Sequence, residues 1–270
     1  MRLSVCLLMS GLALAVAGSV QARLADEGHW VVTRVFIDPA LDNSEQRYFT
    51  NDPRLVGRFV DIRPQRLAID GNSPCTKVRR TVTRGTLVGL LKAKLYRRSS
   101  NQRRHPSPAD MRVEGVPTGL IDIVRYNCIA PDTGRAGGVP GHVWSGVAGF
   151  PLASSRRGLL WENEVILELS PSARTQRPSP SFDCNRAHGK AEMTICRDPA
   201  LANWDRSVAK AFALLRDGGG PDAIEPVDDA AALLASQRQW LAERKTCSAN
   251  RDCLENHMFE RTDALMRRQY

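Results

Sequence analysis

The residues of this chain with the most evident chemistry are its cysteines. Seven are present, and Cys6 lies in an apolar N-terminal run. Cysteines can bind zinc, act as nucleophiles or form disulfides, and the redox state of the compartment decides between these uses. The six that follow the N-terminal run are Cys75, Cys128, Cys184, Cys196, Cys247 and Cys253.

The N-terminus indicates export. Arg2 precedes an apolar run over residues 5–17, and residues 20–22, Val-Gln-Ala, have the small side chains of a cleavage site. The run is too short for a membrane span, which needs about 20 apolar residues. We therefore predict a signal peptide over residues 1–22, cleaved after Ala22. The mature protein is then periplasmic or secreted, with no transmembrane segment.

In an oxidising compartment an even number of cysteines predicts a disulfide framework. The competing interpretation is zinc, but structural zinc ligands usually come in C-x-x-C pairs, and the chain has none. We therefore assign all six remaining cysteines to disulfides. Cys75 and Cys128 are the only two before residue 170, so we expect them to pair with each other.

Signatures of catalytic sites are missing. The segment around Ser145 lacks the first glycine of a G-x-S-x-G elbow, and neither H-E-x-x-H nor a phosphate-binding loop is present. The five histidines are scattered, and His188 lies in a polar turn rather than a ligand cluster. Glu162, Glu164 and Glu168 are interpreted as the solvent-facing side of a strand, not as a glycosidase pair. We predict no enzyme, no cofactor and no metal.

The chain divides into two parts of different composition. Residues 170–181 are rich in proline, serine and arginine and predict a linker. Residues 23–169 contain short β-branched or alternating segments, which predict a β-rich barrel or sandwich. Residues 87–96 fit a helix equally well. The predicted strands lie within residues 29–38, 54–62, 66–70, 79–91, 119–128, 142–150 and 164–169.

Residues 182–270 have helical periodicity. Asp198 and Pro199 have the residue types of a cap and a first helical position, and a helix from there should end at the glycines of residues 218–221. Two further helices are expected over about residues 229–246 and 252–268, with a helical turn near 191–195. Trp204 and Trp240 lie at helical spacing, and we expect both in the core. The predicted fold class is α+β in two domains, the second a small disulfide-stapled α-helical bundle.

Charge is distributed unevenly between the two parts. Residues 23–180 contain 24 Lys and Arg against 15 Asp and Glu, whereas residues 181–270 contain 13 against 14. The densest basic stretch spans residues 77–105, and we interpret it as a solvated surface. Attraction to an anionic envelope polymer is the alternative. No nucleic acid is expected as a partner, because the chain is exported and has no nucleic-acid-binding motif.

The C-terminal part carries a scattered set of residues in which four cysteines are in register with a Q-R-x-W-L-x-x-R helix. These residues are Phe182-Asp183-Cys184, Ala187, Glu192, Ile195-Cys196, Pro199, Leu201, Asp205, Gln237-Arg238, Trp240-Leu241, Arg244, Cys247, Cys253-Leu254, Arg261 and Leu265. Residues 182–265 thereby resemble the lysozyme-inhibitor LprI-like family of small exported helical domains. The chain departs from the family at Trp204, where a smaller aliphatic residue is usual, and at Phe212 and Phe259, where tyrosine is common. Lys245 replaces a usual acid.

Most of the matched positions have the character of structural residues. Asp183 and Asp198 suit helix caps, and Arg238, Arg244 and Asp205 could form ion pairs between helices. The four cysteines permit three pairings. We favour the local scheme, in which the pairs are Cys184–Cys196 and Cys247–Cys253. The crossed scheme stays open, because a helical hairpin would bring Cys196 close to Cys247.

The resemblance implies an inhibitor of lysozyme that occludes the substrate cleft without catalysis; the residues that bind lysozyme are not assigned. Many lysozymes are basic, so electrostatic steering would favour an acidic inhibitor, whereas this chain has a formal net charge of +9. Binding would therefore depend on short-range contacts. The alternative function is an envelope-associated structural or adaptor protein. Its basic N-terminal domain would hold an anionic wall or outer-membrane polymer.

Overall fold

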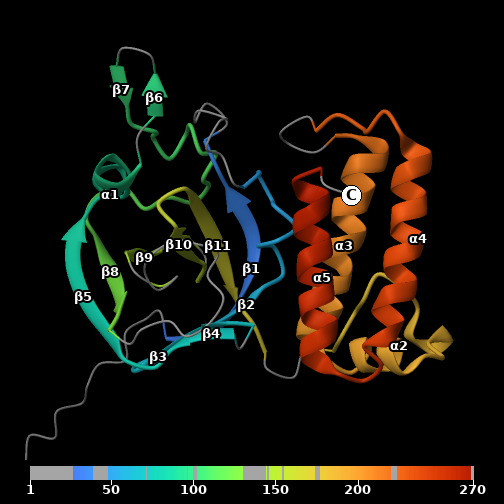
Figure 1. The fold of residues 1–270 in the computed structure, drawn as a ribbon. Coiled ribbons are helices and arrows are strands. Elements are labelled where there is room, and N and C mark those ends of the chain that lie inside the picture. Colours follow the sequence, from blue (N-terminus) through green and yellow to red (C-terminus); the bar gives the residue numbers. More distant parts are fainter. Residues whose placement is uncertain are drawn as a thin grey trace, which may run out of the picture.

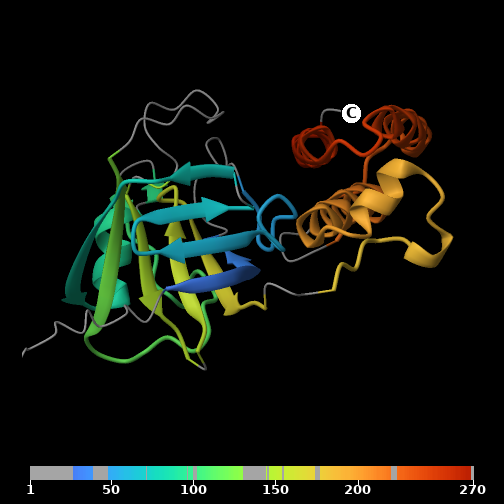
Figure 2. The same ribbon diagram turned by 90° about the horizontal axis from the view of Figure 1, so that it is seen from below.

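A β-barrel and a bundle of helices lie side by side in the computed structural model (Figures 1 and 2). The predicted fold class, α+β with a helical bundle after a β-rich domain, is confirmed, and the β-rich part is a barrel. No helix among the described residues is long and apolar enough to cross a membrane. The predicted signal peptide, Cys6 and Ser145 lie outside the residues that the structure describes. The structure describes residues 27–38, 48–70, 72–95, 97–99, 102–129, 144, 146–153, 155–173, 177–219 and 224–268.

The barrel is one nine-stranded antiparallel sheet with the order β4-β3-β2-β1-β11-β10-β9-β8-β5. A short helix, α1 (Leu87–Lys94), follows β5, so residues 87–94 take the helical alternative. A separate hairpin of β6 (Arg97–Ser99) and β7 (Gln102–Arg104) comes next. The nine strands are β1 (Gly28–Phe36), β2 (Phe59–Arg63), β3 (Arg66–Ile69), β4 (Asn72–Cys75), β5 (Val78–Gly85), β8 (Ile121–Cys128), β9 (Val147–Pro151), β10 (Arg157–Trp161) and β11 (Val165–Pro171).

The two edges of the sheet meet at a seam. The edge strands β4 and β5 follow each other in the sequence, so only a short connection separates them. The disulfide Cys75–Cys128 joins β4 to β8, whose Cys128 is the register partner of Val78 in β5. The bond therefore crosses the seam and ties together two edges that have no mutual ladder of hydrogen bonds. This is the pairing expected from the sequence.

The strands β10 and β11 are buried on both faces. Leu159 and Val165 belong to one hydrophobic cluster, while their neighbours Leu160 and Ile166 belong to another that includes α1. Because successive side chains of a strand point to opposite faces, the two clusters lie on opposite sides of the sheet. In the sequence, such strands appear as continuous apolar runs rather than as an alternation of apolar and polar residues. Strands β4, β6, β7 and β10 lie outside the predicted strand segments.

The helical bundle consists of α2 (Lys190–Ile195), α3 (Pro199–Asp217), α4 (Ala230–Thr246) and α5 (Arg251–Met266), preceded by the short 3-10 helix η1 (Cys184–Arg186). Helices α2, α3 and α4 begin within one residue of their predicted positions, and α5 begins one residue before its predicted position. Trp204 and Trp240 are both buried in the bundle core, as predicted. Residues 172, 173 and 177–183 contain no helix or strand, whereas residues 170 and 171 belong to β11; the linker over residues 170–181 stays a prediction.

A disulfide that encloses a longer segment should contribute more to stability, with a dependence on the logarithm of the enclosed length. Cys75–Cys128 spans 53 residues and Cys247–Cys253 spans 6. Chain-entropy arguments give losses of about 4 and about 2 kcal/mol on removal. Urea unfolding of the double serine variants at each pair measures the difference. Equal losses would mean that the seam disulfide does not act mainly on the unfolded chain.

Candidate functional site: the helical bundle and its contact with the barrel

Side-chain caps begin two helical elements of the bundle, η1 and α3, where the sequence predicts them. Asp183 accepts a hydrogen bond from the backbone N–H of Asn185 at 2.9 Å. Asp198 accepts from the N–H groups of Ala200 at 2.8 Å and Leu201 at 3.1 Å. An N-cap of this kind is typically worth about 1 kcal/mol. The predicted capping roles of Asp183 and Asp198 are confirmed.

Two buried polar contacts tie the helices to each other. Asp205 of α3 accepts from Arg244 Nη1 of α4 at 2.7 Å, and from both the N–H and the hydroxyl of Ser181. Arg261 of α5 donates to Gln237 and Ser236 of α4. The predicted ion pair of Arg244 with Asp205 is therefore present. Arg238 is exposed and forms no ion pair with another described residue.

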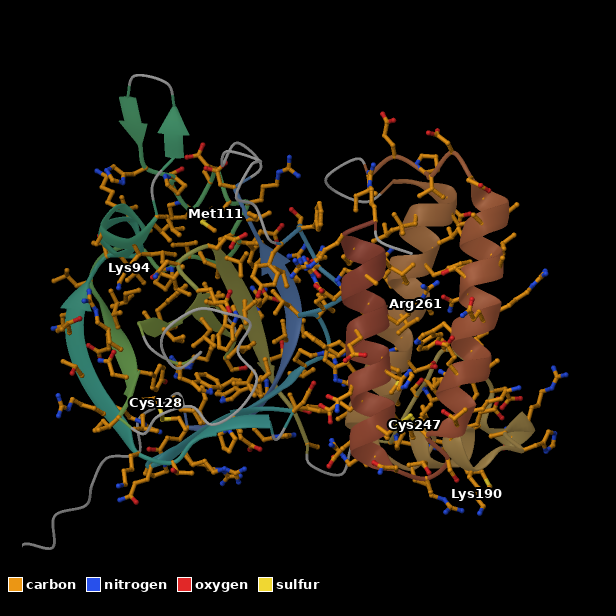
Figure 3. The ribbon with its side chains drawn as sticks, viewed as in Figure 1. Lys94, Met111, Cys128, Lys190, Cys247 and Arg261 are labelled. Atoms are coloured by element: carbon orange, nitrogen blue, oxygen red, sulfur yellow. A yellow bond between two sulfur atoms is a disulfide. The ribbon has the colours of Figure 1, made fainter. Side chains whose placement is uncertain are left out.

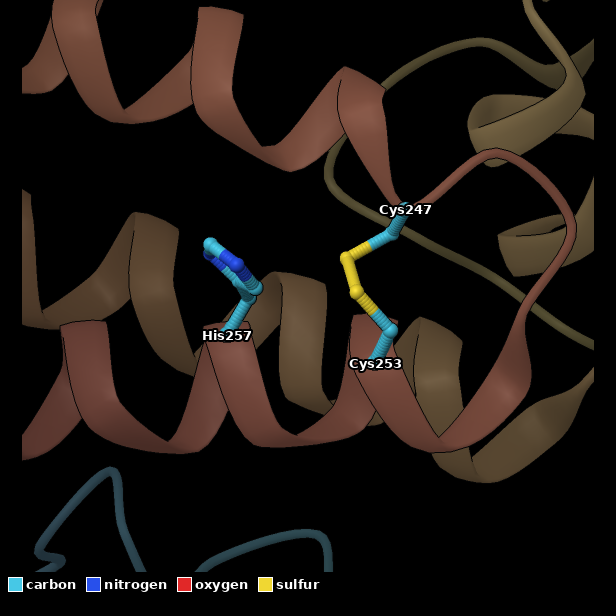
Figure 4. Close-up of side chains that lie close together, drawn as sticks. All are labelled: Cys247, Cys253 and His257. Carbon is cyan, nitrogen blue, oxygen red and sulfur yellow. A yellow bond between two sulfur atoms is a disulfide. The ribbon is translucent and has the colours of Figure 1, made fainter.

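The structure contains the local disulfides Cys184–Cys196 and Cys247–Cys253 rather than the crossed pair. Close to the second pair lies His257, and the three side chains offer ligand atoms within 4.8 Å of one another (Figure 4). Cysteine binds zinc as a free thiolate. Because the two sulfur atoms are bonded to each other, this group does not provide them.

The barrel contacts the bundle through residues 49–58, which we call the docking loop (Figure 2). The loop is fixed to the barrel by β1, because the Gly57 N–H donates to the carbonyl of Val32 and the Val32 N–H donates to the carbonyl of Arg58. Gly57 has φ of +85°, a conformation that favours glycine. Its own carbonyl accepts from Asn203 Nδ2 of α3 at 2.6 Å.

Arg54 of the docking loop links the barrel to α5. Its Nε and Nη2 donate to the carboxylate of Asp52, and its Nη1 donates to Asp263 Oδ1 at 3.0 Å. Burial alone would lower the pKa of Arg54, but these two carboxylates raise it above its ordinary value. The guanidinium therefore stays charged, and it bridges a loop carboxylate and a helix carboxylate.

Arg58 is almost completely buried at this contact, with 2% of its surface exposed. Its guanidinium carbon lies 3.4 Å from the ring centroid of Trp204, a cation–π contact, and its Nη2 donates to Ser207 Oγ at 2.9 Å. Its Nη1 lies 3.2 Å from Asp70 Oδ2. Trp204 and Ser207 belong to α3 and Asp70 follows β3, so the partners of Arg58 come from both parts of the molecule.

Asp70 is the barrel's own counter-charge for Arg58. It follows β3 in a left-handed conformation with φ of +48°, and its Oδ1 accepts from the Phe59 N–H at 2.7 Å. Burial raises the pKa of Asp70 to about 6, and the charge of Arg58 opposes this rise. Burial likewise lowers the pKa of Arg58 to about 10. At neutral pH the two form a charged pair that has been removed from water.

The contact covers one side of the bundle and leaves the other side open. The docking loop lies against α3 and α5, and α2 and α4 lie on the side away from the barrel (Figures 1 and 2). Leu234 and Leu241 of α4 and Met193 of α2 remain exposed. A protein partner has access to this open side without displacing the barrel.

The three glutamates do not form the solvent-facing row that the sequence predicts. Glu162 and Glu164 flank the β10–β11 turn, where they accept from Tyr48. Glu168 is 3% exposed and pairs with Arg156 Nη1 at 2.5 Å. The prediction of a solvent-facing side chain is wrong for Glu168, because both faces of β11 are buried. A buried acid on this strand needs an ionic partner.

The basic stretch of residues 77–105 is spread over several elements rather than gathered into one site. It runs through β5, α1 and the β6–β7 hairpin. Arg80 pairs with Glu27 at 2.9 Å, and Arg84 lies 3.7 Å from Asp122. Part of its charge is therefore compensated locally. Attraction to an anionic envelope polymer stays a prediction.

By its fold, the bundle is a small helical module that two local disulfides hold together. Residues 183–265 match the family model described as Lysozyme inhibitor LprI. The N-terminal half matches no family model. The resemblance predicted for residues 182–265 is thus confirmed for the bundle. Searches of curated proteins and of solved structures found no match.

Sequence reasoning missed the residues that join the two parts. Arg54 and Arg58 lie in a segment predicted as a strand, whereas the structure has turns there until β2 begins at Phe59. The available signal was Trp204, which stands where the family usually has a smaller aliphatic residue. A tryptophan at that position supplies the ring on which Arg58 lies.

We expect Arg58 and Asp70 to be strongly coupled. Replacing Arg58 with a neutral residue leaves the Asp70 carboxylate buried without its counter-charge, which costs about 3–5 kcal/mol at pH 7, whereas the same replacement beside Asp70→Asn costs much less. A double-mutant cycle with Arg58→Met and Asp70→Asn, measured by urea unfolding at pH 7, tests this. The matched exposed pair Arg34–Glu114 should show coupling below about 1 kcal/mol. Additive losses at Arg58 and Asp70 would contradict the assignment.

The raised pKa of Asp70 predicts a pH dependence of stability. Between pH 4 and about 6 the folded protein holds a proton on Asp70 that the unfolded chain has already released. The free energy of unfolding therefore falls as pH rises through this window, by at most about 3 kcal/mol for this group. Asp70→Asn should remove this slope, and Asp122→Asn, an exposed control, should keep it. Identical pH profiles for Asp70→Asn and the unmodified protein would refute the prediction.

Proposed function

We propose that this protein is an exported, non-catalytic inhibitor of lysozyme, and that the helical bundle is its inhibitory part. The observation that carries the proposal is the family match over residues 183–265, since these residues form α2 to α5 and both bundle disulfides. The disulfides fit an oxidising compartment, which supports the periplasm or the exterior as the location.

The proposed mechanism is occlusion of the substrate cleft. An inhibitor of this kind needs a rigid surface and a few well-placed polar groups, not a catalytic constellation. The bundle meets the first requirement, because capped helices, two disulfides and the buried Arg244–Asp205 ion pair hold its backbone, and the side formed by α2 and α4 is open to a partner.

We propose that residues 23–169 form a carrier domain and that residues 182–270 form the inhibitory domain. Residues 170–181 are the linker between them. The barrel holds the bundle through the docking loop on α3 and α5. It thereby fixes which side of the bundle faces outward.

An inhibition titration tests the proposal. The oxidised mature protein, residues 23–270, should abolish the lysis of a cell-wall suspension by a C-type lysozyme at about one inhibitor per enzyme. Treatment with a dithiol should weaken inhibition, because the stapled helices lose their constraint. A cellulase serves as the control enzyme and should keep its activity. Absence of both inhibition and calorimetric binding, with lysozymes of basic and acidic charge, would reject the proposed function.

A further inference from the structure

One segment of the bundle combines exposure, rigidity and positive charge. The segment closed by the disulfide between Cys184 and Cys196, residues 184–196, is here called the stapled loop. It lies on the side of the bundle away from the barrel, and Lys190 marks this position (Figure 3). Most of its first seven residues are exposed, and 36% of Met193 is exposed.

The cations of the stapled loop are free to meet a partner. Arg186 and Lys190 are exposed, and neither forms an ion pair with another described residue. The nearby acids are engaged with backbone instead: Asp183 accepts from the Asn185 N–H, and Glu192 accepts from the N–H groups of His188 and Gly189. The loop therefore presents two cationic side chains, while the carboxylates of Asp183 and Glu192 accept hydrogen bonds from backbone N–H groups.

The backbone of the loop is fixed before any partner arrives. The disulfide closes it, and Ala191 and Ile195 are buried in the core of the bundle at 4% and 0% exposure. A preorganised loop loses little conformational entropy on binding, which is the usual route to tight inhibition by a small contact. Only the rotamers of Arg186 and Lys190 need to be ordered.

A muramidase offers the complementary chemistry. Glycoside hydrolases generally hold two carboxyl groups on either side of the scissile bond, inside a substrate cleft. Charge pairs that become desolvated in such a cleft are among the interactions that dominate binding. We propose that the stapled loop enters this cleft, with Arg186 and Lys190 facing the two catalytic carboxyl groups. This inference rests on the proposed function and assigns it a site.

The test compares two charge-matched double variants of the mature protein. Arg186→Ala/Lys190→Ala removes the loop cations, and Lys210→Ala/Arg66→Ala removes two exposed cations from α3 and β3, away from the side formed by α2 and α4. We expect the first variant to inhibit a C-type lysozyme about 10- to 100-fold more weakly, and the second to stay within about 3-fold of the unmodified protein. All four positions are exposed, so thermal unfolding should be unchanged for both variants.

A second measurement locates the contact on the enzyme. N-acetylglucosamine trisaccharide, which fills the substrate cleft of the lysozyme, should compete with binding of the mature protein in calorimetry. Equal weakening of both double variants, or binding that the trisaccharide leaves unchanged, would overturn the stapled loop as the site. If the unmodified protein fails to inhibit at all, the proposed function itself is refuted, and this result is distinct from a failure of the loop.

Discussion

The arrangement of the two parts depends on one buried cation. Arg58 is removed from water, and the free energy needed to bury a guanidinium is recovered only if neighbouring groups compensate its charge. Asp70 compensates it from the barrel, while Trp204 and Ser207 compensate it from α3. Since neither part alone provides all three contacts, this interaction favours one mutual orientation. The open side of the bundle follows from that orientation.

The helices were predictable because their signals are local. Apolar residues at three- and four-residue steps, the caps Asp183 and Asp198, and the glycines after α3 all lie within a few residues of the feature they determine. The barrel strands gave a weaker signal. Strands β10 and β11 are buried on both faces, so the period of two that identifies a half-buried strand is lost in them. The burial of Glu168 was missed for the same reason.

The docking contact has no local signal at all. Arg58 and Ser207 are 149 positions apart, and nothing in the segment around Arg58 distinguishes a buried arginine from a surface one. From the sequence alone, Arg54 and Arg58 therefore belong to the basic surplus of the N-terminal part. What the sequence did contain was the departure from the family at Trp204. Here the departure coincides with the surface on which the barrel docks, because Arg58 lies over the ring of Trp204.

The same contact changes the electrostatic argument about a basic partner. The charges of Arg54 and Arg58 are compensated internally by Asp52, Asp263 and Asp70, so they add little to the field outside. The remaining surplus belongs mostly to the barrel, which lies beyond α3 and α5. A partner on the α2 and α4 side is separated from it by two layers of helices, each about 10 Å thick. Because the Debye length is about 8 Å at physiological ionic strength, repulsion from the barrel is largely screened at that distance, and short-range contacts decide binding.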